Sequence, residues 1–329
     1  MRQIQVRFES QIGLLYLKTS AFPRTIISRK KMLEIVWKNV FSFILYHYLA
    51  FHGLFYLVTG HTHWATFAFN LFLAQLSNLG TISGAHRLWT HRSYQAQLPL
   101  KLFLMFCNNI SNQNSIYDWV RDHRVHHKFS DTDADPHNIK RGFFFAHMGW
   151  LMVRKHPEVT IKGQTLDFSD IDSDKLIQFQ RKYFKFLAFF CSIFLPVVVP
   201  WYYWGENWYV SLCITFVRYV GTLHGTWLVN SAAHVYGTRP YDSDIKPTEN
   251  PIVAYITMGE GWHNYHHTFP WDYRASEFDS FNGNVNTVFI NFMAKVGLAH
   301  GLKTASLSLI QRKKLKSTNS TTNKKQLQK

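Results

Sequence analysis

Uncharged, apolar stretches alternate with polar blocks along this chain. Residues 39–86 contain no Asp, Glu, Lys or Arg, and this stretch is long enough for two transmembrane helices, since each needs roughly 20 residues. We place them near 40–59 and 64–84. Later in the chain, apolar stretches predict a third span at 186–204 and a fourth at 208–230. The pattern therefore predicts an all-α membrane protein with four transmembrane helices.

Positively charged residues predict the orientation of these spans. The turns between the first and second spans and between the third and fourth contain no Lys or Arg, whereas the flanking polar blocks contain nearly all of them. Because short loops rich in Lys and Arg stay on the cytosolic side of a membrane, both termini and the polar blocks should be cytosolic. We expect an N-terminal segment over residues 1–38, one domain over 39–310, and a disordered basic tail over 311–329 that lacks an apolar pattern.

The net charge of +16 narrows the choice of partners. Such an excess suits nucleic acid, an anionic membrane surface or a phosphate-rich substrate. No zinc-finger or RNA-recognition signature accompanies the charge, so we expect no nucleic acid and favour the lipid bilayer and a phosphate-bearing substrate. The three cysteines have no paired spacing, which argues against a disulfide framework.

Histidines in three segments are the strongest chemical signal in the sequence. The pattern H-x-x-H-H occurs twice and H-x-x-x-x-H once, and the residues are His86, His91, His123, His126, His127, His263, His266 and His267. On a helix, positions i, i+3 and i+4 share one face, so each triplet can present its imidazoles together. The first pair is five residues apart and splayed around its helix, which suits two neighbouring metals better than one. Converging imidazoles suit iron, zinc or copper.

The residues around the histidines favour one class of metal site. Soluble di-iron enzymes use carboxylates and Glu-x-x-His pairs, but the carboxylates here are not at ligand spacing. The H-E-x-x-H pattern of zinc hydrolases is missing. A histidine-rich site for two Fe²⁺ ions beside a membrane predicts activation of O2 and attack on an unactivated C–H bond of a hydrocarbon chain.

Longer stretches around these patterns resemble the membrane acyl-CoA desaturases of the stearoyl-CoA Δ9 type. The resemblance extends over roughly residues 35–300, and the matching stretches are 84–94, 121–128, 133–138, 142–145, 227–234 and 259–270. It implies a stem of four transmembrane helices under a cytosolic helical cap that holds a di-iron site. It also implies a multi-pass protein of the endoplasmic reticulum membrane.

The resemblance implies nine histidine ligands, because His234 joins the eight found from their spacing. One iron would be held by His86, His127, His234, His263 and His267. The other would be held by His91, His123, His126 and His266, with Asn230 acting through a water molecule. These nine histidines would form the catalytic centre.

The resemblance also implies the substrate and the source of electrons. A fatty acyl-CoA would receive a cis double bond, with O2 and two electrons from cytochrome b5 and its NADH reductase, in unsaturated fatty acid biosynthesis. The matching positions for a bend in the acyl tunnel are Gln113, Trp119 and Thr226. Those for the CoA headgroup are Asn39, Asn114, Arg121, Asp122, Arg154, Lys155 and Trp227. Arg and Lys beside phosphates are chemically sensible and account for part of the positive charge.

Asn78 departs from the pattern of the family, which usually has a small apolar residue at this position near the blind end of the tunnel. Either the polar side chain alters the preferred acyl chain, or it turns toward another helix and forms a hydrogen bond there. Two other functions remain open. A fatty acid or alkane hydroxylase shares the histidine spacing, and a non-catalytic zinc-binding membrane protein would share the ligands.

Overall fold

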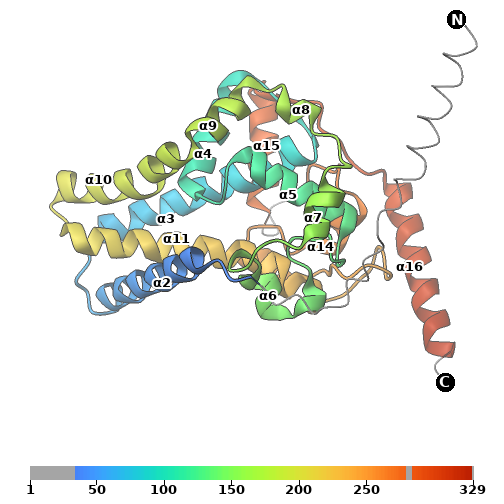
Figure 1. The fold of residues 1–329 in the computed structure, drawn as a ribbon. Coiled ribbons are helices and arrows are strands. Elements are labelled where there is room, and N and C mark those ends of the chain that lie inside the picture. The colour runs from blue at the N-terminus through green and yellow to red at the C-terminus, as the bar shows by residue number, and fades with distance from the viewer. Residues whose placement is uncertain (1–33, 279–283, 328–329) are drawn as a thin grey trace, which may run out of the picture. The chain divides into compact units, whose positions relative to one another are not determined.

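The stem of the molecule consists of four helices that run side by side (Figure 1). The computed structural model describes residues 34–278 and 284–327, and from Ile35 onward the chain forms one compact unit. The stem helices are α2 (Trp37–Val58), α3 (Trp64–Asn78), α10 (Leu195–Trp204) and α11 (Trp208–Asn230). All four segments predicted as spans are therefore helical. The predicted N-terminal segment lies outside the described residues as far as residue 33.

Two of the stem helices continue into neighbouring elements without a break. α3 runs directly into η1 (Leu79–Thr90), which is a π-helix, and α9 (Lys175–Phe189) runs through η4 (Phe190–Phe194) into α10. Two helices, Trp37–Val58 and Lys175–Trp204, are long and apolar enough to cross a membrane. Large apolar side chains are exposed on the outside of the stem, among them Phe41, Phe51, Phe55, Phe72 and Tyr202.

Small residues and buried polar contacts hold the stem helices together. A Cβ atom at Gly53 of α2 would lie 2.5 Å from the carbonyl oxygen of Cys213 on α11, so only glycine allows this close approach. The guanidinium of Arg218 is buried and donates to Ser192 and to the carbonyl oxygen of Ile110. Because Ser192 belongs to η4 and Ile110 to α4 (Leu98–Ser111), one side chain of α11 connects three helical segments.

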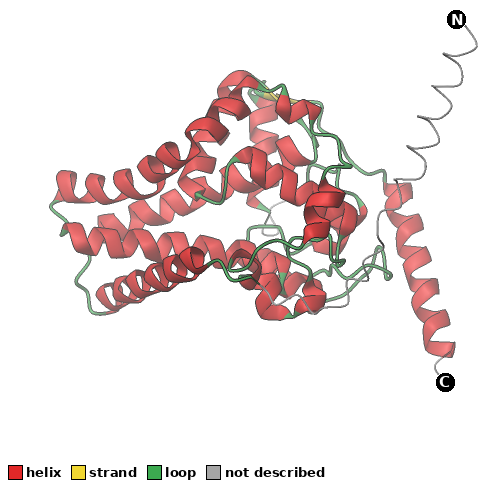
Figure 2. Cartoon of the chain, viewed as in Figure 1, coloured by secondary structure: helices red, strands yellow, loops and turns green. Residues whose placement is uncertain are grey.

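The rest of the described chain consists of helices joined by loops, with very little strand (Figure 2). Further helices and one two-stranded antiparallel sheet pack at one end of the stem. The strands of the sheet are β1 (Gln95–Ala96) and β2 (Ala299–His300). The helices are α4 (Leu98–Ser111), α5 (Ile116–Phe129), η2 (Ile139–Arg141), α6 (Phe143–His147), η3 (Gly149–Leu151), α7 (Pro157–Gly163), α8 (Ser169–Asp172), α12 (Ala232–Val235), α13 (Pro251–Ile256), α14 (His263–Thr268) and α15 (Val285–Lys295). Their largest apolar core includes Leu88 of η1, Leu104 of α4, Ile116 of α5, Ile177 of α9 and Ile290 of α15. This core fixes η1 and α5, the first two histidine-bearing segments, against each other.

The prediction of a disordered tail from residue 311 is wrong for most of that segment. Helix α16 covers Leu307–Leu327. Ile310 is buried against Tyr241 and Phe269, and Lys314 forms an ion pair with Glu277 at 2.6 Å. The segment was predicted to be disordered because its polar residues show no apolar periodicity, but an apolar anchor at its start and an ion pair one turn later are enough to dock its first turns.

Candidate metal centre

Nine histidines from four helical elements meet in the interior of the protein. They form two groups, and within each group the potential ligand atoms lie within 4.8 Å of one another. Group one consists of His86, His91, His123, His127 and His266. Group two, by the same measure, consists of His126, His234, His263 and His267. All nine predicted histidines are thus brought together. The structure also places His234, which the spacing patterns did not find, beside the others.

Each H-x-x-H-H triplet is divided between the two groups, with its first and last histidines in one group and its middle histidine in the other. On α5, His123 and His127 lie one turn apart and face group one, whereas His126 faces group two. On α14 the arrangement is reversed, because the outer histidines of the triplet face group two and His266 faces group one. Positions i and i+4 share a face more closely than position i+3 does. The predicted division of ligands is therefore wrong for His86, His126 and His127, which belong to the opposite sets.

The pair His86 and His91 was also predicted wrongly, as splayed between two metals. Both belong to group one, and their ring centroids lie 4.9 Å apart. In an α-helix, residues five apart point in different directions. Here the segment is a π-helix, and the N–H of His91 donates to the carbonyl oxygen of His86 at 3.1 Å. This wider turn brings the two rings to the same side.

The imidazoles point their Nε2 atoms toward one another. In group one, His266 Nε2 lies 2.9 Å from both His86 Nε2 and His127 Nε2. In group two, His263 Nε2 lies 3.1 Å from both His234 Nε2 and His267 Nε2. A neutral imidazole carries one N–H and one lone pair, so three nitrogens facing one another cannot all be satisfied by hydrogen bonds. A cation that accepts the converging lone pairs fits both groups.

Burial keeps these imidazoles in the form that binds metals. Desolvation, followed by repulsion from neighbouring histidines, holds the pKa well below its ordinary value for His91, His123, His127, His263, His266 and His267. They are therefore neutral at physiological pH. A neutral imidazole is the species that coordinates a metal ion.

A carboxylate stands behind one histidine of group one. Glu260 Oε2 lies 2.9 Å from His86 Nδ1, and Glu260 Oε1 accepts from Arg87 Nη2 at 2.6 Å. Burial opposes the charge of Glu260, but His86 and Arg87 outweigh it and lower the pKa of Glu260 to about 2. An ionised carboxylate at Nδ1 keeps the proton on that nitrogen and leaves Nε2 free to coordinate.

Two aspartates stand behind histidines of group two. Both carboxylate oxygens of Asp135 lie 3.0 Å from His126 Nδ1. Asp131 Oδ1 lies 3.4 Å from His234 Nδ1, and Asp131 has a left-handed backbone with φ of +59°. Sequence reasoning missed both aspartates and Glu260. Two signals were available: Asp135 and Glu260 lie within the matching stretches 133–138 and 259–270, and Asp131 comes four residues after His127.

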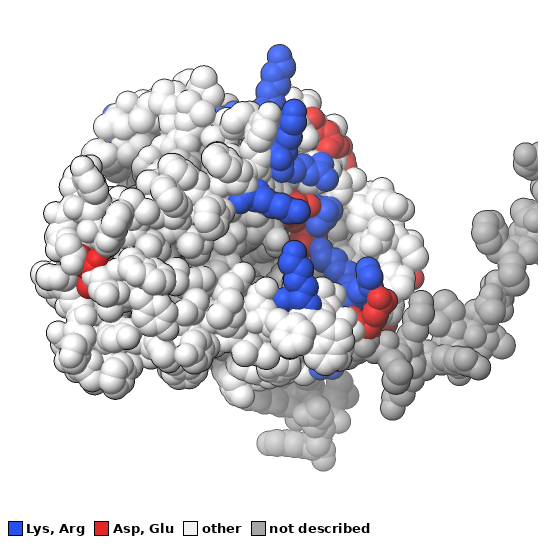
Figure 3. Space-filling view, turned by 60° about the vertical axis from the view of Figure 1, so that its left-hand side comes forward, with Lys and Arg blue, Asp and Glu red and all other residues white. Residues whose placement is uncertain are grey.

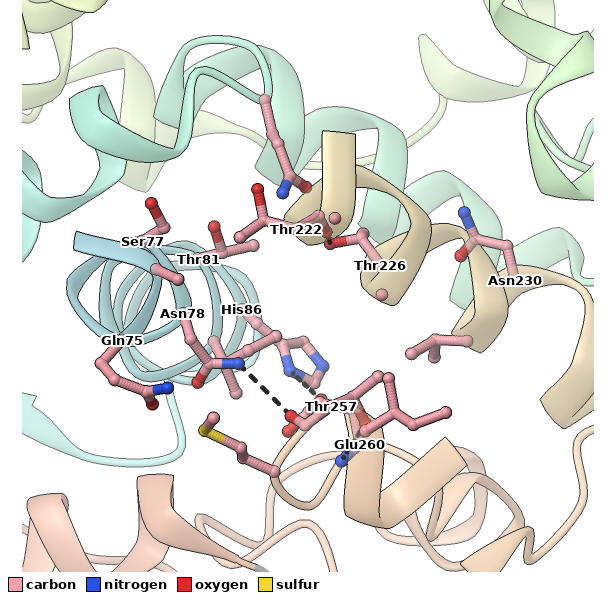
Figure 4. A pocket seen from close by; sticks show the side chains of 18 of the residues that line it. Gln75, Ser77, Asn78, Thr81, His86, Thr222, Thr226, Asn230, Thr257 and Glu260 are labelled. Carbon is pink, nitrogen blue, oxygen red and sulfur yellow. Dashed lines mark hydrogen bonds and ion pairs between the residues drawn. The ribbon is translucent and has the colours of Figure 1, made fainter. Parts of the chain in front are cut away.

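Two cavities meet beside the histidines. The first cavity lies among α3, η1, α11 and the end of α13 (Figure 4), and the second lies among α2, α5, η3 and α11. Gln113, Trp119, Thr226, Asn230 and His123 line both cavities. The three residues predicted at the bend of a tunnel are therefore placed where the two cavities join, next to group one.

Most of the residues predicted for a headgroup lie around the second cavity, which Asn39, Asn114, Asp122 and Trp227 line. Arg121 and Lys155 both form ion pairs with Asp122. Arg154 is exposed and does not line either cavity. Lys and Arg gather around a hollow between the nearly uncharged stem and the opposite end of the molecule (Figure 3).

Asn78 forms the hydrogen bonds that one of the two open alternatives expects, and it also faces the first cavity. It lines the first cavity (Figure 4), and its side chain also forms hydrogen bonds with other segments. Its Nδ2 donates to the carbonyl oxygen of Thr257 at 3.3 Å, and its Oδ1 accepts from Asn286 Nδ2 at 2.7 Å. The amide is therefore satisfied within the protein while it forms part of the cavity wall.

A helical protein with two adjacent groups of buried imidazoles beside internal cavities belongs to the class of histidine-rich metalloenzymes. The family model for fatty acid desaturases matches residues 62–278, and the chain belongs to the fatty acid desaturase family.

Curated relatives agree with this assignment and with the resemblance seen in the motifs. The chain is 52% identical to an acyl-CoA Delta-9 desaturase of Acheta domesticus, over 85% of this chain and 78% of that protein. It is 46% identical to an acyl-CoA Delta-12 desaturase of Tribolium castaneum, over 88% and 81%. It is 51% identical to the stearoyl-CoA desaturase of Homo sapiens, over 84% and 77%.

Proposed function

We propose that this protein is an acyl-CoA desaturase that inserts a cis double bond at the Δ9 position of a saturated fatty acyl-CoA. The observation that carries this proposal is the position of group one at the junction of the two cavities, where His123 lines both, with His263 of group two in the wall of the first. A chain that passes through both cavities would present one C–C bond to the metal centre. Relatives named for Delta-9 and Delta-12 positions are similarly close, so the motif resemblance to the Δ9 type decides our choice.

Two Fe²⁺ ions are the proposed cofactors. Bound iron would supply the activation of O2 and the cleavage of unactivated C–H bonds. Group one would hold one ion through its five histidines, and group two would hold the other through its four. Asn230, which lines both cavities together with His123 of group one, would act through a water molecule. The all-nitrogen ligand set suits a divalent transition metal.

The side chains around the cavities would hold and orient the substrate. Gln113, Trp119 and Thr226 at the junction would force the acyl chain to bend, which restricts the position of reaction through positioning alone. The headgroup would lie at the second cavity, and the residues around it are Asn39, Asn114, Arg121, Asp122, Arg154, Lys155 and Trp227. Arg121 and Lys155 are suited to CoA phosphates because both are cationic and lie beside Asp122 at the cavity wall.

The stem would cross the endoplasmic reticulum membrane four times, with the histidine groups and both termini in the cytosol. The two long apolar helices, the exposed apolar side chains of the stem and the concentration of Lys and Arg at one end of it support this topology. A glycosylation acceptor site inserted after Gly60 or after Gly205 should be modified in microsomes, and one inserted after Lys140 should not. Modification at Lys140 would contradict the topology.

The electrons would come from cytochrome b5 and its NADH reductase. The purified protein should form product with NADH only when both partners are present. Product formation that is equally fast without cytochrome b5 would contradict this assignment.

Expression in a desaturase-deficient yeast strain tests the reaction itself. We expect rescue of growth and new Δ9 monoenes, with loss of both in His123→Ala and His266→Ala. The exposed His61 is the site of the matched control, His61→Ala, which should behave as the wild type. Hydroxylated acyl chains in place of monoenes would indicate the hydroxylase alternative. A lipid profile unchanged by wild-type expression, with zinc as the bound metal, would indicate a non-catalytic protein.

A further inference from the structure

The carboxylates behind the two histidine groups come from different parts of the chain. Glu260 precedes α14 and contacts His86 of group one. Asp131 and Asp135 belong to the loop that follows α5, and they contact only histidines of group two among the nine ligands. Between them, Asp133 of the same loop is exposed. Two of the three acidic residues of the loop therefore face inward, onto one group, and the one between them faces outward.

The backbone of this loop is built around its inward-facing carboxylates. Asp135 Oδ2 accepts from the N–H of Asp131 at 2.8 Å, and Asp135 Oδ1 accepts from the N–H of His137 at 3.1 Å. Asp131 itself has the left-handed conformation that non-glycine residues rarely adopt. Backbone strain of this kind persists only when surrounding contacts enforce it. The loop is therefore arranged to hold two carboxylates at fixed positions behind His126 and His234.

The charges around the two groups differ. Glu260 shares its charge between His86 and Arg87, and Arg87 is fully buried, so the carboxylate behind group one is offset by a neighbouring cation. Among the described residues, neither Asp131 nor Asp135 forms an ion pair with Lys or Arg. The two carboxylates beside the ligands of group two thus have no Lys or Arg partner among the described residues, whereas the carboxylate beside group one is paired with Arg87.

We infer that these carboxylates are positioning residues for two separable metal sites. Glu260 holds a ligand of the metal in group one, and the loop from Asp131 to Asp135 holds two ligands of the metal in group two. Each carboxylate lies within ion-pair distance of Nδ1 of its histidine, where its charge favours the proton on Nδ1 and makes Nε2 a stronger donor. Loss of such a partner typically weakens metal binding by about 10–100-fold. The inference rests on the proposed function, which places one iron in each group.

The test compares Asp135→Asn and Asp131→Asn with Glu260→Gln in the purified full-length protein loaded with Fe²⁺. Asp133→Asn is the matched control, since it removes a charge from the same loop without touching a histidine. We expect each of the three variants to lose one of two irons to a chelator concentration about 10–100-fold lower than the wild type requires. Mössbauer spectra should show that Asp131→Asn and Asp135→Asn lose the same iron signal, and that Glu260→Gln loses the other one.

Three outcomes would overturn the inference: loss of the same signal in all variants, simultaneous loss of both irons, or retention equal to that of Asp133→Asn. Asp135 also anchors its loop, so Asp135→Asn can fail to fold; Asp131→Asn, whose side chain contacts only His234 among the ligands, then decides the question. Failure of the proposed function looks different, because the wild type itself would then bind no iron or would bind iron and form hydroxylated chains in place of monoenes.

Discussion

The N–H of His91 donates a hydrogen bond to the carbonyl oxygen of His86, five residues earlier in the chain, at 3.1 Å. This single π-helical turn places both imidazoles in group one. We expect His91→Ala to lower desaturase activity at least ~100-fold, because loss of a ligand costs no less than loss of its supporting partner. Iron content should fall toward one ion per chain. The assay is product formation together with iron analysis of the purified protein, with His61→Ala as the control, and full activity in His91→Ala would contradict the assignment.

Asn78 offers a test of how the first cavity selects its substrate. Asn78→Ala replaces a side chain in the cavity wall with a smaller one and so enlarges the cavity at that point. We therefore expect a shift of the product toward longer acyl chains. It also leaves Asn286 without its acceptor, which costs about 1–3 kcal/mol of stability. Asn286→Ala breaks the same hydrogen bond, but Asn286 does not line the cavity. Gas chromatography of products should therefore show a shift for the first variant only; equal shifts in both would mean that the hydrogen bond, and not the cavity wall, controls chain length.

Gly53 and Gly221 provide a matched pair of small residues in the stem. A Cβ at Gly53 would lie 2.5 Å from both Cys213 O and Val217 Cγ2, whereas a Cβ at Gly221 would meet nothing within 4 Å. Gly53→Ala must push α2 away from α11 and should cost about 1–3 kcal/mol. Gly221→Ala should leave stability nearly unchanged. Thermal denaturation in detergent separates the two, and an unchanged Tm for Gly53→Ala would show that the helices are not in close contact.

Glu249 gives the protein a specific dependence on pH. Burial raises its pKa from 4.5 to about 7, while its Oε1 accepts from the N–H of Tyr265 at 2.7 Å. The folded state therefore binds this proton more tightly than the unfolded state does. The contribution to stability is complete below pH ~4.5 and is lost as the pH rises through ~7.

Glu249→Gln removes this titration while it keeps an acceptor for Tyr265. We expect the variant to match the wild type near pH 5 and to be more stable by about 2–3 kcal/mol near pH 8. Thermal denaturation of both proteins across this range measures the difference. A gap between the two that does not widen as the pH rises would contradict the prediction.

Apolar periodicity and charge predicted the helices of the stem well. The segments at 40–59 and 208–230 differ from α2 and α11 by at most three residues at either end. The reason is that an uncharged run bounded by polar turns leaves few alternatives. The same rule failed at the C-terminal tail, where the apolar anchor is the short segment with Ile310 and Leu309 at the start of α16, which a search for apolar stretches does not detect.

The chemistry of the site was predicted more fully than its geometry. Histidine spacing identified eight of the nine clustered imidazoles, but not which of them act together. That assignment depends on a π-helix at His86, which no residue pattern announced, and on the reversed arrangement of the triplet at His266. Glu260, Asp131 and Asp135 were missed because a carboxylate that supports a ligand needs no fixed spacing from it in sequence.

Because each triplet contributes to both groups, neither group can be complete before α14, the last histidine-bearing helix, has been synthesised. Group one needs His266, and group two needs His263 and His267, so neither is complete until the ribosome has passed α14. By then η1, α5 and α12 have already been made. Loading of the two proposed irons would thereby be postponed until the whole histidine framework exists, and a chain truncated before α14 would carry no complete metal centre.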